Sequence, residues 1–110
     1  MRAGKLRHVV TFIERDPTAP EDALGNANAW RSLITDLPAG VEDIRGKEDR
    51  DAAKYGAELT HKVWVRYHPD IAGRADLRVQ FRGRELDVHA VVNWQERDRW
   101  LIVLCDERQS

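Results

Sequence analysis

The sequence predicts an all-β fold: a small six-stranded antiparallel β-barrel or sandwich with a long charged loop after the second strand. In the last third of the chain, Leu77, Val79 and Phe81 alternate with polar residues, and a second alternating run follows the turn at 82–83. A period of two between polar turns is typical of antiparallel strands with one buried face. Residues 45–57, in contrast, are mostly charged and show no strand period.

The strand-like segments follow one another within a single domain, residues 1–110. Because proline has no N–H to donate, Pro38, together with Gly40, is expected to interrupt the second strand. Six twisted strands in so small a domain curl into a barrel or a two-layer sandwich, since their edges must be protected. The predicted strands are 6–14, 29–37 with a resumption at 41–44, 58–67, 77–82, 86–94 and 100–105.

The fifth and third predicted strands place their aromatic residues differently. On the fifth, a period of two puts one apolar set on a single face: Leu86, Val88, Ala90, Val92 and Trp94. On the third, Trp64 shares the wetter face with Lys62 and Arg66. Trp64 is therefore either an aromatic anchor of an interface or part of a second, partly covered core face.

The overall charge is nearly neutral, with 18 Lys plus Arg against 19 Asp plus Glu. This balance disfavours a dedicated duplex-DNA binder, which carries a basic surplus, but leaves local contact with nucleic acid open. The single cysteine, Cys105, lies in an apolar run and is expected to pack in the core. No apolar stretch approaches the roughly 20 residues of a membrane helix, and no export signal precedes the first strand.

Catalytic and metal-binding patterns are absent from the sequence. Ser32 and Ser110 have no nucleophile-elbow context, and the histidines share no ligand spacing with one another. His61 is in phase with Leu59 and Val63, so it is expected to be a hydrogen-bonded structural histidine. We therefore expect no enzyme activity, no metal site and no cofactor.

The charged segment 45–57 has too little apolar content to pack on a core. A short helix over Lys47–Tyr55 is compatible with its composition, but such a helix would have no apolar face. A solvated loop is the ordinary outcome for a run of charges. Its length favours a loop that becomes ordered against neighbouring subunits or nucleic acid.

Four segments together resemble the head-closure proteins of tailed bacteriophages, also called head–tail joining or stopper proteins. The opening Ala3–Val10 resembles the family's Gly-x-Leu-Arg and following strand. Val41–Glu48 resembles the strand that leads into a long loop, and Thr60–Tyr67 resembles the third strand. Residues 77–105 resemble the C-terminal meander. The chain departs from this pattern in the longer, proline-rich segment 15–29 and at 37–40.

The resemblance implies a small β-barrel that assembles as a homo-oligomeric ring, a dodecamer or hexamer. The ring would lie in the virion neck, beneath the portal and adaptor and above the tail terminator or tail tube protein. It would close the head around packaged double-stranded DNA, without contact to a membrane, after assembly in the host cytoplasm. The particle would be a phage, a prophage product or a gene transfer agent, and exposed strand edges would become pairing sites between subunits.

The resemblance also implies the site residues. The loop that points into the channel and gates it maps onto Arg45, Gly46, Lys47, Glu48, Asp49, Arg50, Asp51, Lys54 and Tyr55. Their mixed signs would let neighbouring loops pair with each other and offer cations to DNA phosphates. The candidate interface consists of Lys62, Trp64, Arg66 and Arg7.

Two alternatives stay open on the sequence. A tail terminator or another ring protein of the neck is the nearest. A small oligonucleotide-binding β-barrel is the second, because Trp64 with Lys62 and Arg66 could form an aromatic and basic strand face.

Overall fold

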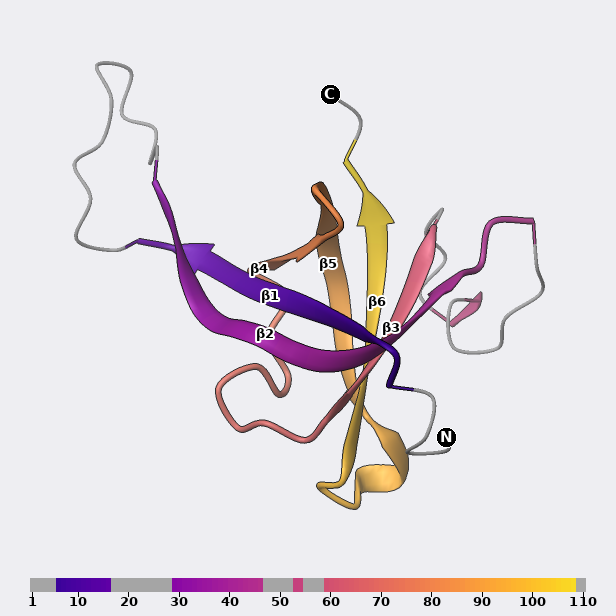
Figure 1. Ribbon diagram of the computed structural model, residues 1–110. Helices are drawn as coiled ribbons and strands as arrows, with labels where there is room; N and C mark the ends of the chain where they lie inside the picture. The colour runs from indigo at the N-terminus through magenta and orange to yellow at the C-terminus, as the bar shows by residue number, and fades with distance from the viewer. Residues whose placement is uncertain (1–5, 17–28, 47–52, 55–58, 109–110) are drawn as a thin grey trace.

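Six strands form a closed antiparallel barrel in the computed structural model, which describes residues 6–16, 29–46, 53–54 and 59–108 (Figure 1). The predicted all-β class and the barrel are confirmed. The segment Lys47–Tyr55, whose composition is compatible with a short helix, lies mainly outside the described residues. The elements are β1 (His8–Arg15), β2 (Trp30–Asp43), β3 (His61–Arg66), β4 (Leu77–Phe81), β5 (Arg84–Asn93), one 3-10 turn η2 (Trp94–Glu96) and β6 (Trp100–Glu107).

The strand order around the barrel is β1-β2-β3-β6-β5-β4, and β4 closes it against β1. The predicted C-terminal meander is present, since β4, β5 and β6 are consecutive neighbours. Phe81 pairs with Arg84 around a two-residue turn in which Arg82 and Gly83 have φ of 49° and 76°. Positive φ at both central positions is the geometry whose twist matches a β-hairpin, and glycine adopts it without strain.

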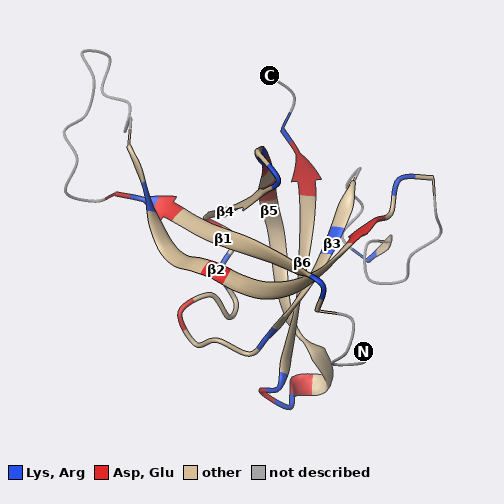
Figure 2. Cartoon of the chain, viewed as in Figure 1, with Lys and Arg blue, Asp and Glu red and all other residues tan. Residues whose placement is uncertain are grey.

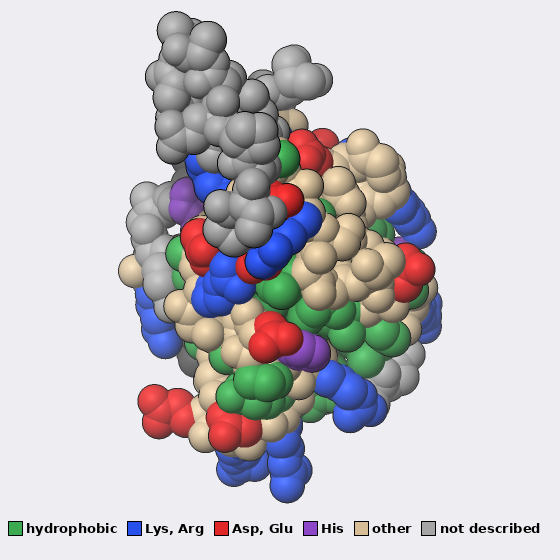
Figure 3. Space-filling view, turned by 90° about the vertical axis from the view of Figure 1, so that its left-hand side faces the viewer, with side chains coloured by type: hydrophobic (Ala, Val, Ile, Leu, Met, Phe, Trp, Pro, Cys, Tyr) green, Lys and Arg blue, Asp and Glu red, His purple; other side chains and the backbone are tan. Residues whose placement is uncertain are grey.

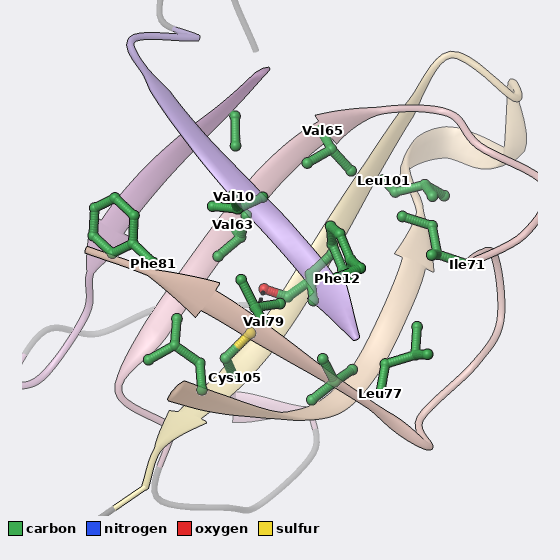
Figure 4. Close-up of a cluster of buried hydrophobic side chains, with 14 residues drawn as sticks. Val10, Phe12, Val63, Val65, Ile71, Leu77, Val79, Phe81, Leu101 and Cys105 are labelled. Carbon is green, nitrogen blue, oxygen red and sulfur yellow. Dashed lines mark hydrogen bonds between the residues drawn. The ribbon is translucent and has the colours of Figure 1, made fainter. Parts of the chain in front are cut away.

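The interior of the barrel holds the main hydrophobic core (Figure 4). Alternate residues of β4 point inward, as the sequence predicts, and Cys105 is fully buried among them. Val10 and Phe12 contribute from β1, and Val63 and Val65 from β3. The period of two therefore predicts the inward face correctly on β3 and β4.

β2 is one continuous strand of 14 residues, so the expected interruption at Pro38 and Gly40 is wrong. Ile44 donates its N–H to Thr60 across the β2–β3 pair, and alternation along the ladder then directs the nitrogen of Pro38 toward the β3 side. The pairing with β3 begins only at Ala39, so the missing N–H removes no hydrogen bond. Gly40 continues the strand opposite Trp64.

β5 changes its inward face part-way along, which corrects the single apolar face expected from the sequence. The pairing with β6 shifts register between Val88 and Ala90. Leu86 and Val88 point into the interior, but after the shift Val91 packs on the interior cluster instead of Ala90. Ala90, Val92 and Trp94 turn to the outside of the barrel. One extra residue in a strand reverses every side chain beyond it.

β2 and β5 each lose one neighbour toward the barrel end opposite the 45–58 loop. Trp30–Pro38 pairs with β1 only, and Val88–Asn93 pairs with β6 only, among the described strands. The connection between β3 and β4 lies beside β2 at this end, where it inserts the fully buried Ile71 into the core (Figure 1). The closed order of strands thus still leaves part of two strand edges without a partner strand.

Candidate channel loop and interface

The loop between β2 and β3 leaves the barrel through a closed stem. Ile44 donates its N–H to the carbonyl of Thr60 at 2.9 Å. Ile44 and Leu59 are both buried in a second hydrophobic cluster on the outside of β3, β6 and β5. The two ends of the loop are therefore fixed on the barrel wall, which gives the loop a defined point of origin.

Arg45, the first residue of the predicted channel loop, is held at the stem. Its guanidinium lies 2.6 Å from Asp43 Oδ2, and its backbone N–H donates to Asp43 Oδ1 at 2.9 Å. These hydrogen bonds hold the pKa of the Asp43 carboxyl well below its usual range. Gly46 follows with φ of 75°, a left-handed conformation that turns the chain away from β2.

The other predicted loop residues fall largely outside the described part of the chain. Lys54 is exposed. Lys47, Glu48, Asp49, Arg50, Asp51 and Tyr55 lie outside the described residues. Of the predicted channel loop, the structure thus locates Arg45, Gly46 and Lys54.

Alternating charges surround the stem at this end of the barrel. Glu107 of β6 lies 4.0 Å from the Arg45 guanidinium and 3.3 Å from that of Arg84. Together with Asp43 these residues form the series Asp43, Arg45, Glu107 and Arg84, with signs in alternation. Figure 2 shows the same general pattern, with charged residues of both signs gathered toward strand ends and connections.

His61 lies at the same end and is 2% exposed, as expected for a structural histidine. The Thr60 hydroxyl accepts the Glu107 N–H at 2.8 Å, so its own hydrogen is available to His61 Nδ1, 2.8 Å away. Burial lowers the pKa of His61, and the bond from Thr60 suits a neutral ring with Nδ1 as acceptor. The Thr60 hydroxyl therefore joins the stem to β6, and it also holds the buried His61 ring through Nδ1.

The outer face of β3 brings together three of the four predicted interface residues. Trp64 meets Trp94 edge to face, with ring centroids 6.2 Å apart. The Lys62 ammonium lies 5.4 Å from the centre of the Trp64 ring, and Arg66 lies 5.2 Å from that of Trp100. These are distances at which a cation is attracted by the face of an aromatic ring.

The second hydrophobic cluster bears on whether Trp64 is an interface anchor or part of a second, partly covered core face. Ile102 and Leu104 are buried on the outside of β6, under Trp64 and Trp94. Trp64 thus belongs to a second, partly covered core face. Lys62 is only 8% exposed, which the period of two did not predict. The signal for this cluster was present in β6, whose apolar run has no polar alternate positions.

Arg7, the fourth predicted interface residue, is exposed just before β1. β2 separates β1 from β3, because His8 pairs with Ala39 and Ala39 pairs with Val65. Arg7 therefore lies on the same side of the barrel but two strands away from the Trp64 group.

A further ion-pair network lies at the opposite end and was not anticipated. Glu14 of β1 accepts hydrogen bonds from Arg31 of β2 at 2.8 Å and from Arg74 at 3.1 Å. Arg74 is also bound by Asp76 at 2.8 Å. These contacts lower the pKa of Glu14 and attach the β3–β4 connection to the β1–β2 hairpin. Residues far apart in sequence make the network, so no local pattern could have predicted it.

Among the described residues, no group of three or more His, Cys, Asp and Glu side chains is placed to hold a metal ion. The described helical segment is also neither long nor apolar enough to cross a membrane.

The comparisons with known proteins agree with this geometry. The family model described as phage head completion protein matches residues 1–108. The chain belongs to the phage head completion protein family. It is thus a phage structural component of the head–tail junction with a role in head closure, as the resemblance implies.

A solved structure supports the fold of this head completion protein. The solution structure of protein SF1141 from Shigella flexneri 2a matches with a TM-score of 0.68 and 28% sequence identity. The match covers 97% of this chain and 96% of that chain. The search among curated proteins found no match.

Proposed function

We propose that this head completion protein assembles as a ring beneath the portal and adaptor, retains packaged DNA and provides the surface on which the tail docks. Family membership supports a role in head closure. The main structural support for ring assembly and channel gating is the stem of the loop. Ile44 and Thr60 close the base of this charged loop on the barrel wall. A loop with a fixed base and a charged span can extend from each subunit toward a common axis.

The charges of the loop suit this role. Residues 45–54 contain both cations and anions, so loops from neighbouring copies can pair with each other and still present cations to DNA phosphates. Arg45 is already neutralised by Asp43, so the channel cations of this proposal are Lys47, Arg50 and Lys54. The chain performs no catalysis in this proposal; it acts by occupying the channel.

The oligonucleotide-binding alternative is weaker on this geometry. Stacking of bases needs an aromatic face that is free of other contacts. Trp64 has Trp94 against it and the Lys62 ammonium over its ring. The Trp64 ring is therefore already in contact with other side chains of the same molecule, on the outer face of β3.

The test uses a producer cell that lacks this chain, complemented with variants. Without the chain we expect emptied heads beside separate tails of normal length. Replacing residues 47–55 with a short Gly-Ser linker leaves the stem intact and is expected to restore the ring but not DNA retention. Replacing Lys47, Arg50 and Lys54 with Gln keeps the length of the loop and is the matched variant for charge. Full DNA retention and normal tail joining in the linker variant would contradict the gating role, and tails of irregular length would indicate a tail terminator instead.

A further inference from the structure

The direction in which the predicted channel loop leaves the barrel depends on how its two ends are held. Figure 3 shows the side of the molecule on which the β1–β2 hairpin projects, and Lys and Arg side chains are interspersed there with Asp and Glu. A surface of mixed charge exerts no one-sided attraction on a loop that itself carries both signs. The contacts at the base of the loop are therefore the ones that can fix its direction.

Thr60, at the second end of the loop, is bound to two neighbouring strands through its main chain. Its carbonyl accepts the N–H of Ile44 at 2.9 Å, at the end of β2, and its N–H donates to the carbonyl of Cys105 in β6 at 2.9 Å. His61 and Cys105 are the last residues that pair between β3 and β6 at this end. Beyond that pair, Thr60 makes the contacts that hold the stem between its neighbours.

The Thr60 hydroxyl provides a further attachment, to the end of β6. It accepts the N–H of Glu107 at 2.8 Å and lies 2.8 Å from His61 Nδ1, to which it can donate its own hydrogen. His61 is 2% exposed, so water has little access with which to replace the hydroxyl. A valine has nearly the shape of threonine but neither donor nor acceptor, so the hydroxyl can be removed without changing the shape of the side chain.

Glu107 connects this hydroxyl to the first end of the loop. Its N–H is held by Thr60, and its carboxylate lies 4.0 Å from the guanidinium of Arg45. Ile44, the residue before Arg45, is itself bound to Thr60, so these contacts form a closed circuit around the stem. The contact between Glu107 and Arg45 is long and exposed and contributes little alone. The hydrogen bond to the Thr60 hydroxyl is therefore the stronger connection between the stem and the end of β6.

We propose that Thr60 is a positioning residue of the channel loop: its hydroxyl fixes the stem against the end of β6 and so sets the direction in which the loop extends. This inference rests on the proposed function, in which the loop extends into a channel and retains DNA. It adds a requirement that the charges of the loop do not meet alone. A loop with all of its charges but a freely moving base would occupy the channel only part of the time.

Amide hydrogen exchange of the isolated protein tests the hydroxyl. T60V removes it, and T60S keeps it. T11V is the matched control, because the Thr11 hydroxyl also accepts a backbone N–H, that of Asp36 at 3.3 Å, but at the bulge between β1 and β2. We expect the amide of Ile44 to exchange about tenfold faster or more in T60V, although its own acceptor, the Thr60 carbonyl, is unchanged. T60S and T11V should leave the exchange of Ile44 as it is, and an equal rate in T60V and T11V would overturn the proposal.

The unaltered protein decides if T60V does not fold. Ile44 and Glu107 are both bound to Thr60, so their amides should become exposed to exchange in the same opening of the stem. Exchange rates of these two amides, corrected for their neighbours in sequence, that differ by more than about tenfold would overturn the proposal.

Producer cells that carry the same variants test the link to DNA retention. We expect T60V to enter heads in the same amount as the unaltered chain, measured by quantitative mass spectrometry, but most of those heads to lose their DNA. T60S and T11V should retain DNA normally. A merely structural role of Thr60 would lower incorporation together with DNA retention and would overturn the proposal.

The variant with a linker in place of residues 47–55 separates this proposal from the proposed function. Full DNA retention with T60V, while the linker variant loses DNA, would refute the positioning role of Thr60 and leave the proposed function standing. DNA retention by the linker variant would instead overturn the proposed function and, with it, the positioning role.

Discussion

Ile44 and Thr60 stand at the two ends of the predicted channel loop and are joined by a backbone hydrogen bond of 2.9 Å. Beside this bond, Leu59 and Ile44 are buried in the outer cluster, against which Trp64 and Trp94 also pack. The loop base is therefore stabilised by the same outer cluster that covers β6. Changes in that cluster should act on the stem and on barrel stability together.

Leu59→Ala should destabilise the barrel by about 2–4 kcal/mol, because it removes a buried side chain and leaves a cavity under the stem. Chemical denaturation measures this change. Val9→Ala is the matched control, since Val9 is 56% exposed and its truncation should change stability by no more than about 0.5 kcal/mol. Equal effects of the two substitutions would show that the outer cluster does not support the stem.

Lowering the pH below about 6.5 should destabilise the protein through His61. Burial lowers the pKa of His61 in the folded state, so the unfolded chain binds more protons as the pH falls through the ordinary histidine value of 6.5. The stability due to neutral His61 is thus present above that value and lost below it. H61N can still accept a hydrogen bond from Thr60 and should flatten the dependence of Tm on pH between about 7 and 5. A slope as steep in H61N as in the unaltered protein would contradict this role.

Asp43 should act in a separate, more acidic range. Its folded pKa lies below the ordinary value of 3.8, because Arg45 donates hydrogen bonds to its carboxylate. The resulting stability is present above that value and lost as the pH falls through the folded pKa. D43N should therefore lower Tm at neutral pH, and the difference from the unaltered protein should vanish in strong acid. A difference that stays constant with pH would point to packing, not to the Asp43–Arg45 pair.

Arg66→Glu should leave the barrel folded but reduce its incorporation into particles, if the outer face of β3 contacts a neighbour. Arg66 is exposed, and its contact with Trp100 is worth only about 0.5–1 kcal/mol at such a site. The amount of chain per particle, measured by quantitative mass spectrometry, is the readout. Arg97→Glu, in the turn before β6 and outside the candidate interface, is the control. The same incorporation for both variants would remove Arg66 from the interface.

Cys105 should be inert toward thiol reagents in the native protein. It is fully buried in the barrel, and burial raises the pKa of its thiol well above the usual range. Labelling should therefore follow the rate at which the barrel opens. Val9→Cys supplies an exposed thiol as control and should react at once. Fast labelling of Cys105 without denaturant would mean that the β6 region opens easily.

The sequence was sufficient to predict the number of strands and most inward faces, because alternation is a local property. It was insufficient at Pro38, where the outcome depends on which neighbour β2 has at that point. It was also insufficient at the bulge between Val88 and Ala90. The alternation of apolar and polar residues continues through the bulge, so the sequence does not show the shift in register. Both errors concern pairing between strands, which no single segment encodes.

The candidate site shows the same division. The buried, hydrogen-bonded state of His61 followed from its phase on β3. The burial of Lys62 did not, because it depends on Trp64 and on the outer cluster that β6 completes. The ion pair between Arg45 and Asp43 joins residues two positions apart, but it was not predicted, because a run of mixed charges does not show which residues pair. The resemblance to a family supplied the proposed role of the loop, since the local pattern indicates only that the segment is charged.

The position of β6 has a consequence for how the chain folds during synthesis. β6 is the last strand in chain order, yet it lies between β3 and β5 and pairs with both. A nascent chain that has not released β6 from the ribosome can pair its strands as an open sheet in the order β3-β2-β1-β4-β5, but it cannot close this sheet, because β6 joins β3 to β5. Pairing over such long separations is slow, so barrel closure should come late and only after translation of β6. Incomplete chains would then have no closed barrel with which to enter a particle, and this would keep truncated subunits out of the assembly.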